Sequence, residues 1–349
     1  MKLLKSAGFF LFVYWTLLPS QDLIAQQPQP SQHSLAVPHR QAGLPEPASI
    51  WARHWGLRWE KGYLITYDEL PGGSPEKPTV VLYDRSGQVA REAIVWFKDA
   101  RTVSISDATV SKAGELVVSG GTENEAGVIA NFIASIGSDG RVSRVVRTTP
   151  FLPLHLCDPG DGTVWSYGVD RDAQGRRVED SLMLRHYSLR DGQLTAMLDR
   201  SKLNSSGWSL VDGVYPGAIS LRCTSTKVAL LNVGSSEYGE VDIPTNTLRI
   251  RKLNPLPSPK EMRVTGFALT ESGDVFVSLH DRTSQPVRSG IFKLTFDGTD
   301  VGSWIPVENT VGPYLHGGPV ERLLGADGDD LVYTRDLTGA AFWSQYKSR

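Results

Sequence analysis

The chain has 349 residues, with 36 Lys and Arg residues, 38 Asp and Glu residues and a formal net charge of −2. This near balance provides no broad basic surface, so we expect no nucleic acid among the partners. Gly (34 residues) and Pro (21 residues) are spread evenly with no interior linker, which favours one large repetitive domain over two.

Residues 1–25 have the pattern of a secretory signal peptide. Lys2 and Lys5 precede an apolar run from Ala7 to Pro19, and a polar stretch then leads to Ala25. The run is shorter than the roughly twenty residues that cross a bilayer, so we expect cleavage and no membrane span afterwards, with an uncleaved anchor as the alternative. The mature protein is then secreted or periplasmic. Residues 26–34, rich in Gln, Pro and Ser, are expected to form a flexible tether.

Five hairpin turns recur along the rest of the chain at a nearly constant interval. Their central positions lie 53, 52, 54 and 52 residues apart, at Gly87, Gly140, Gly192, Asn246 and Gly298. Gly and Asn tolerate the positive φ that tight turns between strands require. A period near 50 residues predicts a repeat architecture.

A second series of short apolar strands runs between these turns. Six strands of this series begin at Tyr63, Leu116, Val164, Val228, Val275 and Leu331. Each follows a polar turn that is itself preceded by another apolar run, so every repeat is predicted to contain four antiparallel strands. Four strands in about 53 residues are typical of one blade of a β-propeller.

The two ends of the domain are predicted to share the last blade. One period after Gly298 lies beyond the C-terminus, so this blade ends in the strand-like residues 341–346 without a fourth strand. One period before Gly87 lie residues 35–40, which are similar to the outer strands of other repeats. We therefore predict an all-β, six-bladed β-propeller over residues 35–349. The N-terminal strand closes the ring, and we expect a monomer.

Three of the second strands end in an acid and carry a resemblance to known proteins. They are Tyr63–Asp68, Val275–Asp281 and Leu331–Asp336. These segments resemble blades of exported six-bladed β-propellers of the NHL and TolB-like kind, and the likeness extends over the mature chain. No motif of a particular family is repeated. The resemblance therefore implies a fold without an activity, because propellers host unrelated functions.

Binding is predicted on the propeller face that carries the longer loops, which join second to third strands and lead into each blade. Long, variable loops on a rigid scaffold commonly carry binding residues. The candidates on this rim are Asp68, Glu123, Asp170, Trp208, Tyr215, His280, Asp281, Tyr314, His316 and Asp336.

Three functions are compatible with this chain: a binding scaffold, a hydrolase, and a purely structural module of a larger envelope assembly. The repeated acids are expected to cap turns, and the aromatic side chains could contact a sugar or peptide. We favour an exported, non-catalytic propeller that binds a protein, peptide or glycan outside the cytoplasm. The alternative is a lactonase-like hydrolase in which Ca²⁺, a possible cofactor, is held by carboxylates at the mouth of the central channel.

The two cysteines occupy matching points of adjacent repeats. Cys157 and Cys223 each lie just before a polar turn, and an exported protein meets an oxidising compartment. Equivalent points of neighbouring blades are usually farther apart than the roughly 4.4 to 6.8 Å between bonded Cα atoms, so the pairing stays open. Trp59 and Trp165 lie in predicted strands and are expected in the core.

Overall fold

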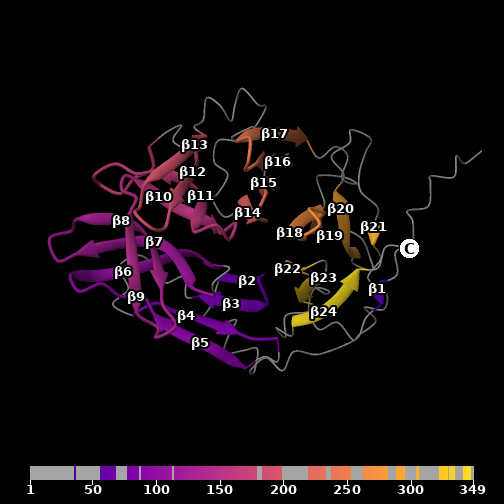
Figure 1. Cartoon of the computed structure of the whole chain (residues 1–349), viewed down its shortest axis with the longest axis horizontal. Coiled ribbons are helices and arrows are strands. Elements are labelled where there is room, and N and C mark those ends of the chain that lie inside the picture. Colours follow the sequence, from indigo (N-terminus) through magenta and orange to yellow (C-terminus); the bar gives the residue numbers. More distant parts are fainter. Residues whose placement is uncertain are drawn as a thin grey trace, which may run out of the picture. The chain divides into compact units, whose positions relative to one another are not determined.

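Every regular element that the structure describes is a β-strand (Figure 1). The computed structural model describes residues 35–36, 56–67, 77–85, 88–111, 114–178, 183–198, 219–232, 237–252, 262–281, 288–294, 304–305, 322–328, 330–334 and 341–346. No helix among these residues is long and apolar enough to cross a membrane. The prediction of an all-β fold is confirmed.

The described strands form six antiparallel sheets of four strands each, which we number in chain order. Sheet 1 contains β2 (Gly56–Glu60), β3 (Tyr63–Tyr67), β4 (Thr79–Tyr83) and β5 (Val89–Ile94). Sheet 2 contains β6 (Ala100–Val110), β7 (Leu116–Asn124), β8 (Ile129–Ile136) and β9 (Val142–Arg147). Sheet 3 contains β10 (Phe151–Cys157), β11 (Thr163–Asp170), β12 (Met183–Ser188) and β13 (Leu194–Leu198).

The remaining sheets follow the same order of strands. Sheet 4 contains β14 (Ile219–Cys223), β15 (Lys227–Asn232), β16 (Glu237–Asp242) and β17 (Thr247–Lys252). Sheet 5 contains β18 (Met262–Leu269), β19 (Val275–Asp281), β20 (Arg288–Leu294) and β21 (Trp304–Ile305). Sheet 6 contains β22 (Arg322–Asp327), β23 (Asp330–Thr334), β24 (Ala341–Tyr346) and β1 (Leu35–Ala36).

Sheet 6 combines strands from two distant parts of the sequence. Leu35 and Ala36 of β1 pair antiparallel with Tyr346 and Gln345 of β24. The segment predicted to supply the fourth strand of this sheet therefore does so at its first two residues. Residues 37–40 of the predicted strand lie outside the described residues.

The hairpin turns form where Gly or Asn permits a positive φ. Gly140, between β8 and β9, has a φ of 74°, and Asn246, between β16 and β17, has a φ of 53°. A β-branched residue in this region of φ and ψ would be strained. The predicted turns at these positions are confirmed, whereas Gly87 and Gly298 lie outside the described residues.

The first strands of successive sheets contact one another in chain order. β2 contacts β6, β6 contacts β10, and the series continues through β14 and β18 to β22, which in turn contacts β2. Buried apolar clusters fill the space between neighbouring sheets; one joins Leu57 and Trp59 of sheet 1 to Leu324 and Val332 of sheet 6. Trp59 is 2% exposed, which confirms its predicted place in the core. Four-stranded sheets packed in this way form a β-propeller.

Glycines mark places where first strands approach closely. A Cβ atom on Gly266 of β18 would lie 2.1 Å from the carbonyl oxygen of Leu323 in β22. A Cβ atom on Gly325 of β22 would lie 2.2 Å from the carbonyl oxygen of Trp59 in β2. Both distances are far below a van der Waals contact, so any larger residue would push neighbouring sheets apart.

Candidate functional site

The structure describes part of the loop-bearing rim that is predicted to bind a partner. Glu123 lies near the end of β7, and Asp170 is the last residue of β11. His280 and Asp281 end β19, where only the backbone is described. The other candidates lie outside the described residues: Asp68, Trp208, Tyr215, Tyr314, His316 and Asp336.

Glu123 and Asp170 belong to different sheets, and each is paired with an arginine of its own sheet. Glu123 Oε1 lies 3.8 Å from Arg101 Nη2. Asp170 Oδ1 accepts a hydrogen bond of 3.2 Å from Arg185 Nη2, and the guanidinium group of Arg185 lies 4.3 Å from the centroid of the Phe151 ring. These ion pairs join neighbouring strands of one sheet. They agree with a structural role for Glu123 and Asp170.

In two loops of the rim, a side chain of the loop accepts hydrogen bonds from the loop's own backbone. Between β7 and β8, Asn124 Oδ1 accepts a hydrogen bond of 2.9 Å from the backbone N–H of Val128. Between β11 and β12, Asp172 Oδ1 accepts hydrogen bonds from the backbone N–H groups of Gln174 (2.9 Å) and Arg176 (2.8 Å). Local bonds of this kind fix the backbone of a loop. The rim of sheets 2 and 3 is therefore preorganised.

This part of the rim presents aliphatic and guanidinium groups. Val128 is 59% exposed and Val178 is 42% exposed. Arg171 is half-buried, and burial lowers the pKa of its guanidinium group. Its Nε has no hydrogen-bond partner among the described residues, and its backbone pairs with that of Arg177 across the loop. Basic and apolar groups thus lie together on the surface of this loop.

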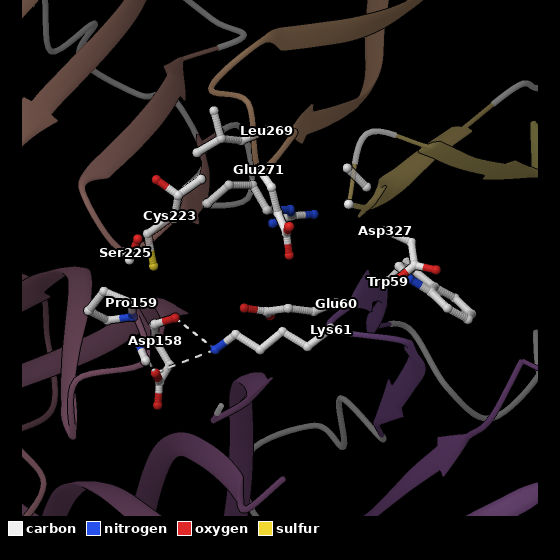
Figure 2. A pocket seen from close by; sticks show the side chains of 15 residues that line it. Trp59, Glu60, Lys61, Asp158, Pro159, Cys223, Ser225, Leu269, Glu271 and Asp327 are labelled. Carbon is white, nitrogen blue, oxygen red and sulfur yellow. Dashed lines mark hydrogen bonds and ion pairs between the residues drawn. The ribbon is translucent and has the colours of Figure 1, made fainter. Parts of the chain in front are cut away.

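A pocket lies on the opposite face, among the turns that join first strands to second strands (Figure 2). Its volume is about 420 Å³, and we call it the turn pocket. Turns of sheets 1, 3, 4, 5 and 6 line it with Trp59, Glu60, Lys61, Asp158, Pro159, Gly160, Arg222, Cys223, Thr224, Ser225, Leu269, Glu271, Ala326, Asp327 and Gly328.

Arg58 connects the first strands of three sheets beneath this pocket. Its Nη1 donates hydrogen bonds to Asp107 Oδ2 (3.0 Å) and to the carbonyl oxygen of Leu156 (2.9 Å). Its Nη2 lies 2.8 Å from Glu60 Oε2, which also accepts a hydrogen bond of 2.7 Å from Thr109 Oγ1. Burial disfavours the charge of Arg58, but the two carboxylates outweigh it, so the pKa of the guanidinium group is raised.

Lys61 makes a second connection between three sheets at the edge of the pocket. Its Nζ donates hydrogen bonds to the carbonyl oxygens of Val110 and Asp158, both at 2.8 Å, and lies 3.4 Å from Asp158 Oδ1. Asp158 Oδ1 also accepts a hydrogen bond of 2.6 Å from the backbone N–H of Gly160. Burial raises the pKa of the Asp158 carboxyl, and the attraction of Lys61 opposes this shift without cancelling it.

Cys157 and Cys223 form a disulfide bond beside the turn pocket, between the ends of β10 and β14. Their Cα atoms are 5.7 Å apart, within the range for bonded cysteines. The expectation that equivalent points of neighbouring repeats lie too far apart does not hold here, because both cysteines are in first strands, which contact one another. The bond fixes two turns that line the pocket.

In the described part of the chain, no group of three or more His, Cys, Asp or Glu side chains is arranged to hold a metal ion. The possible Ca²⁺ site at the rim stays a prediction, because Asp68 and Asp336 lie outside the described residues and only the backbone of Asp281 is described.

No function is predicted from the sequence for the turns that line the turn pocket, because short connections commonly do no more than join two strands. The sequence nevertheless contains a pattern that indicates a site there. Charged residues recur in the first-to-second-strand turns of several repeats, as Lys61, Asp158, Glu271 and Asp327. Since equivalent turns of a propeller surround one axis, repeated charges in them indicate a shared site.

Comparison with known proteins gives a likeness of fold alone. No protein-family profile matches the chain, and no curated protein matches its sequence. A solved luciferin-regenerating enzyme is 14% identical, covering 84% of this chain and 91% of its own, with a TM-score of 0.46. A puromycin-hydrolyzing peptidase of Mycobacterium tuberculosis is also 14% identical, covering 91% and 57%, with a TM-score of 0.47.

A protein of unknown function from Bacteroides caccae is 13% identical, covering 79% of this chain and 92% of its own, with a TM-score of 0.42. At these identities and TM-scores, none of the three assigns an activity to this chain.

Proposed function

We propose that this protein is an exported, non-catalytic, six-bladed β-propeller that binds a partner through its loop-bearing rim. Six sheets with first strands in cyclic contact support the blade count, and the pairing of β1 with β24 supports closure of the ring by the N-terminal strand. Export is inferred from the signal-peptide pattern of residues 1–25, and the Cys157–Cys223 disulfide fits an oxidising compartment.

The observation that carries the binding proposal is the surface formed by the β7–β8 and β11–β12 loops. The loops lie side by side, since a Cβ atom on Gly175 would lie 2.7 Å from Ile129 Cδ1. Exposed Val128 and Val178 provide apolar contact area next to arginine, a residue enriched at protein interfaces.

Among protein, peptide and glycan partners, this surface fits an acidic peptide segment best. Arg171 and Arg177 are cations that can pair with carboxylates in a bidentate manner. No ion pair to either side chain is found among the described residues, whereas Arg176 pairs with Asp172 at 2.8 Å. A peptide with acidic and aliphatic residues would meet both kinds of group on the rim.

Selection from a random peptide library tests this proposal. We expect the purified protein to enrich sequences that contain both acidic and aliphatic residues. Synthetic peptides from this pool should bind the R171E/R177E double variant at least about tenfold more weakly, because like charges then face each other. Binding is followed by fluorescence anisotropy at two salt concentrations.

Arg144→Glu is the matched control, because Arg144 is an exposed residue of the outer strand β9. This variant should bind the peptides as the unmodified protein does. Enrichment of peptides without acidic residues, or equal binding to the double variant, would contradict the proposal.

A further inference from the structure

We infer that the turn pocket binds a small organic cation, a primary ammonium or guanidinium group carried on a short apolar body. This site is separate from the rim, because it lies among the first-to-second-strand turns on the other face. It therefore goes beyond the proposed peptide binding.

The size and walls of the turn pocket suit a small molecule. Its volume of about 420 Å³ falls within the range of roughly 300 to 1,000 Å³ that is usual for small-molecule sites. Pro159, Leu269 and Ala326 contribute apolar wall, and the Cys157–Cys223 disulfide ties two of the surrounding turns together. A folded partner could not enter a cavity of this size.

The two cationic side chains that line the pocket, Lys61 and Arg222, already donate hydrogen bonds to oxygen atoms of the protein. An ammonium group has three N–H donors, and the three donors of Lys61 face three oxygens of Val110 and Asp158. Arg222 donates hydrogen bonds to the carbonyl oxygens of Leu221 (2.8 Å) and Leu324 (3.3 Å). Binding of an anion would have to disrupt these bonds.

Two of the lining acids, in contrast, keep acceptors that no described residue uses. Asp158 is 1% exposed and lines the cavity, yet its Oδ2 has no hydrogen-bond partner among the described residues. Glu271 is exposed, and no described residue forms a hydrogen bond or ion pair with its carboxylate. Figure 2 shows the side chains of Glu60, Lys61 and Glu271 extending toward the same space.

The balance of charge in the lining agrees with this chemistry. Four carboxylates line the pocket. Arg58 pairs with Glu60, Lys61 with Asp158 and Arg85 with Asp327, so Glu271 is the acid of the lining with no ion pair to a described residue. A buried acceptor without a partner is costly, and a ligand that donates hydrogen bonds removes this cost. An ammonium or guanidinium ligand supplies both hydrogen-bond donors for Asp158 Oδ2 and a counter-ion for Glu271.

The inference is tested by titrating the full mature protein with benzylamine and with agmatine. Calorimetry and ¹⁵N–¹H NMR measure the binding. We expect saturable binding with shifts confined to the turns that line the pocket. Benzyl alcohol, a neutral analogue of benzylamine, should bind at least about tenfold more weakly, because it lacks the charge that pairs with carboxylates. CaCl₂ and inorganic phosphate are titrated in parallel.

The variant E271Q should weaken amine binding by about three- to tenfold, because an amide attracts a cation less than a carboxylate does. Glu115→Gln is the matched control, since Glu115 follows the equivalent turn of sheet 2 and does not line the pocket. Equal binding of benzyl alcohol and benzylamine would overturn the inference. So would unchanged affinity in E271Q, or pocket shifts caused by phosphate or Ca²⁺ instead of amines.

Discussion

Charged side chains are buried near the axis because each has partners that replace water. Arg58 is 3% exposed, and its partners Glu60 and Asp107 are almost as deeply buried. Asp107 in turn accepts hydrogen bonds from Tyr67 Oη (3.2 Å) and from the backbone N–H of Leu156 (2.8 Å). Removing one member of such a network leaves an uncompensated charge in a medium of low polarity.

Arg58→Met is therefore expected to lower the free energy of unfolding by about 3 to 5 kcal/mol. Methionine preserves much of the volume but leaves the carboxylates of Glu60 and Asp107 buried without a cation. Urea denaturation followed by tryptophan fluorescence measures the change. Arg91→Met is the control, because Arg91 is only half-buried and, among the described residues, its side chain donates one hydrogen bond, to the carbonyl oxygen of Gly114. Equal losses in both variants would contradict the role given to Arg58.

The roles of individual polar residues could not be predicted from local sequence. Arg58 bonds to residues 49 and 98 positions away, which correspond to about one and two repeats. Nothing in the immediate sequence of Arg58 distinguishes it from a surface arginine. The partners become neighbours only when first strands from different repeats converge.

Strands and turns can be predicted from the sequence more readily than single side-chain contacts. Hairpin turns were predicted from Gly and Asn positions, and the structure has positive φ at Gly140 and Asn246. The close approach of one first strand to the next is not visible in the sequence. It explains both the disulfide between β10 and β14 and the need for glycine at position 325 of β22.

Gly325→Ala is expected to destabilise the protein by about 2 kcal/mol or more, because the new Cβ would overlap the carbonyl oxygen of Trp59 in β2. Thermal unfolding measured by circular dichroism detects this loss as a lower Tm. In Gly121→Ala, the control, the nearest atom to the new Cβ would be a side-chain oxygen of Asn131 at 3.4 Å. A Tm for Gly325→Ala equal to that of the control would show that the two strands can separate at little cost.

The molecule as a whole depends on contacts between repeats. In the proposed ring, sheet 6 is completed by β1, whose residues are more than 300 positions from their partners in β24. The order of contacts from β2 to β22 and back to β2 makes each sheet a neighbour of two others. Loss of one strand should then weaken the entire ring instead of one edge.

Deletion of residues 35–40 tests the closure. We expect a clearly lower Tm and a broader transition, because sheet 6 loses its outer strand and β24 becomes an exposed edge. Deletion of residues 26–34, the predicted tether, is the control and should leave the Tm unchanged. If the Tm is the same after both deletions, the N-terminal strand does not close the ring.

The β-strands, their turns and the period of the repeat follow from the amino-acid sequence alone, because φ preferences and alternating apolar residues act within a few positions. The folded structure is needed to show which charges are buried together, that Cys157 and Cys223 form a disulfide, and that the turns enclose a pocket. These features depend on the distance between first strands of different repeats. That distance is set by the packing of whole sheets, which no local pattern encodes.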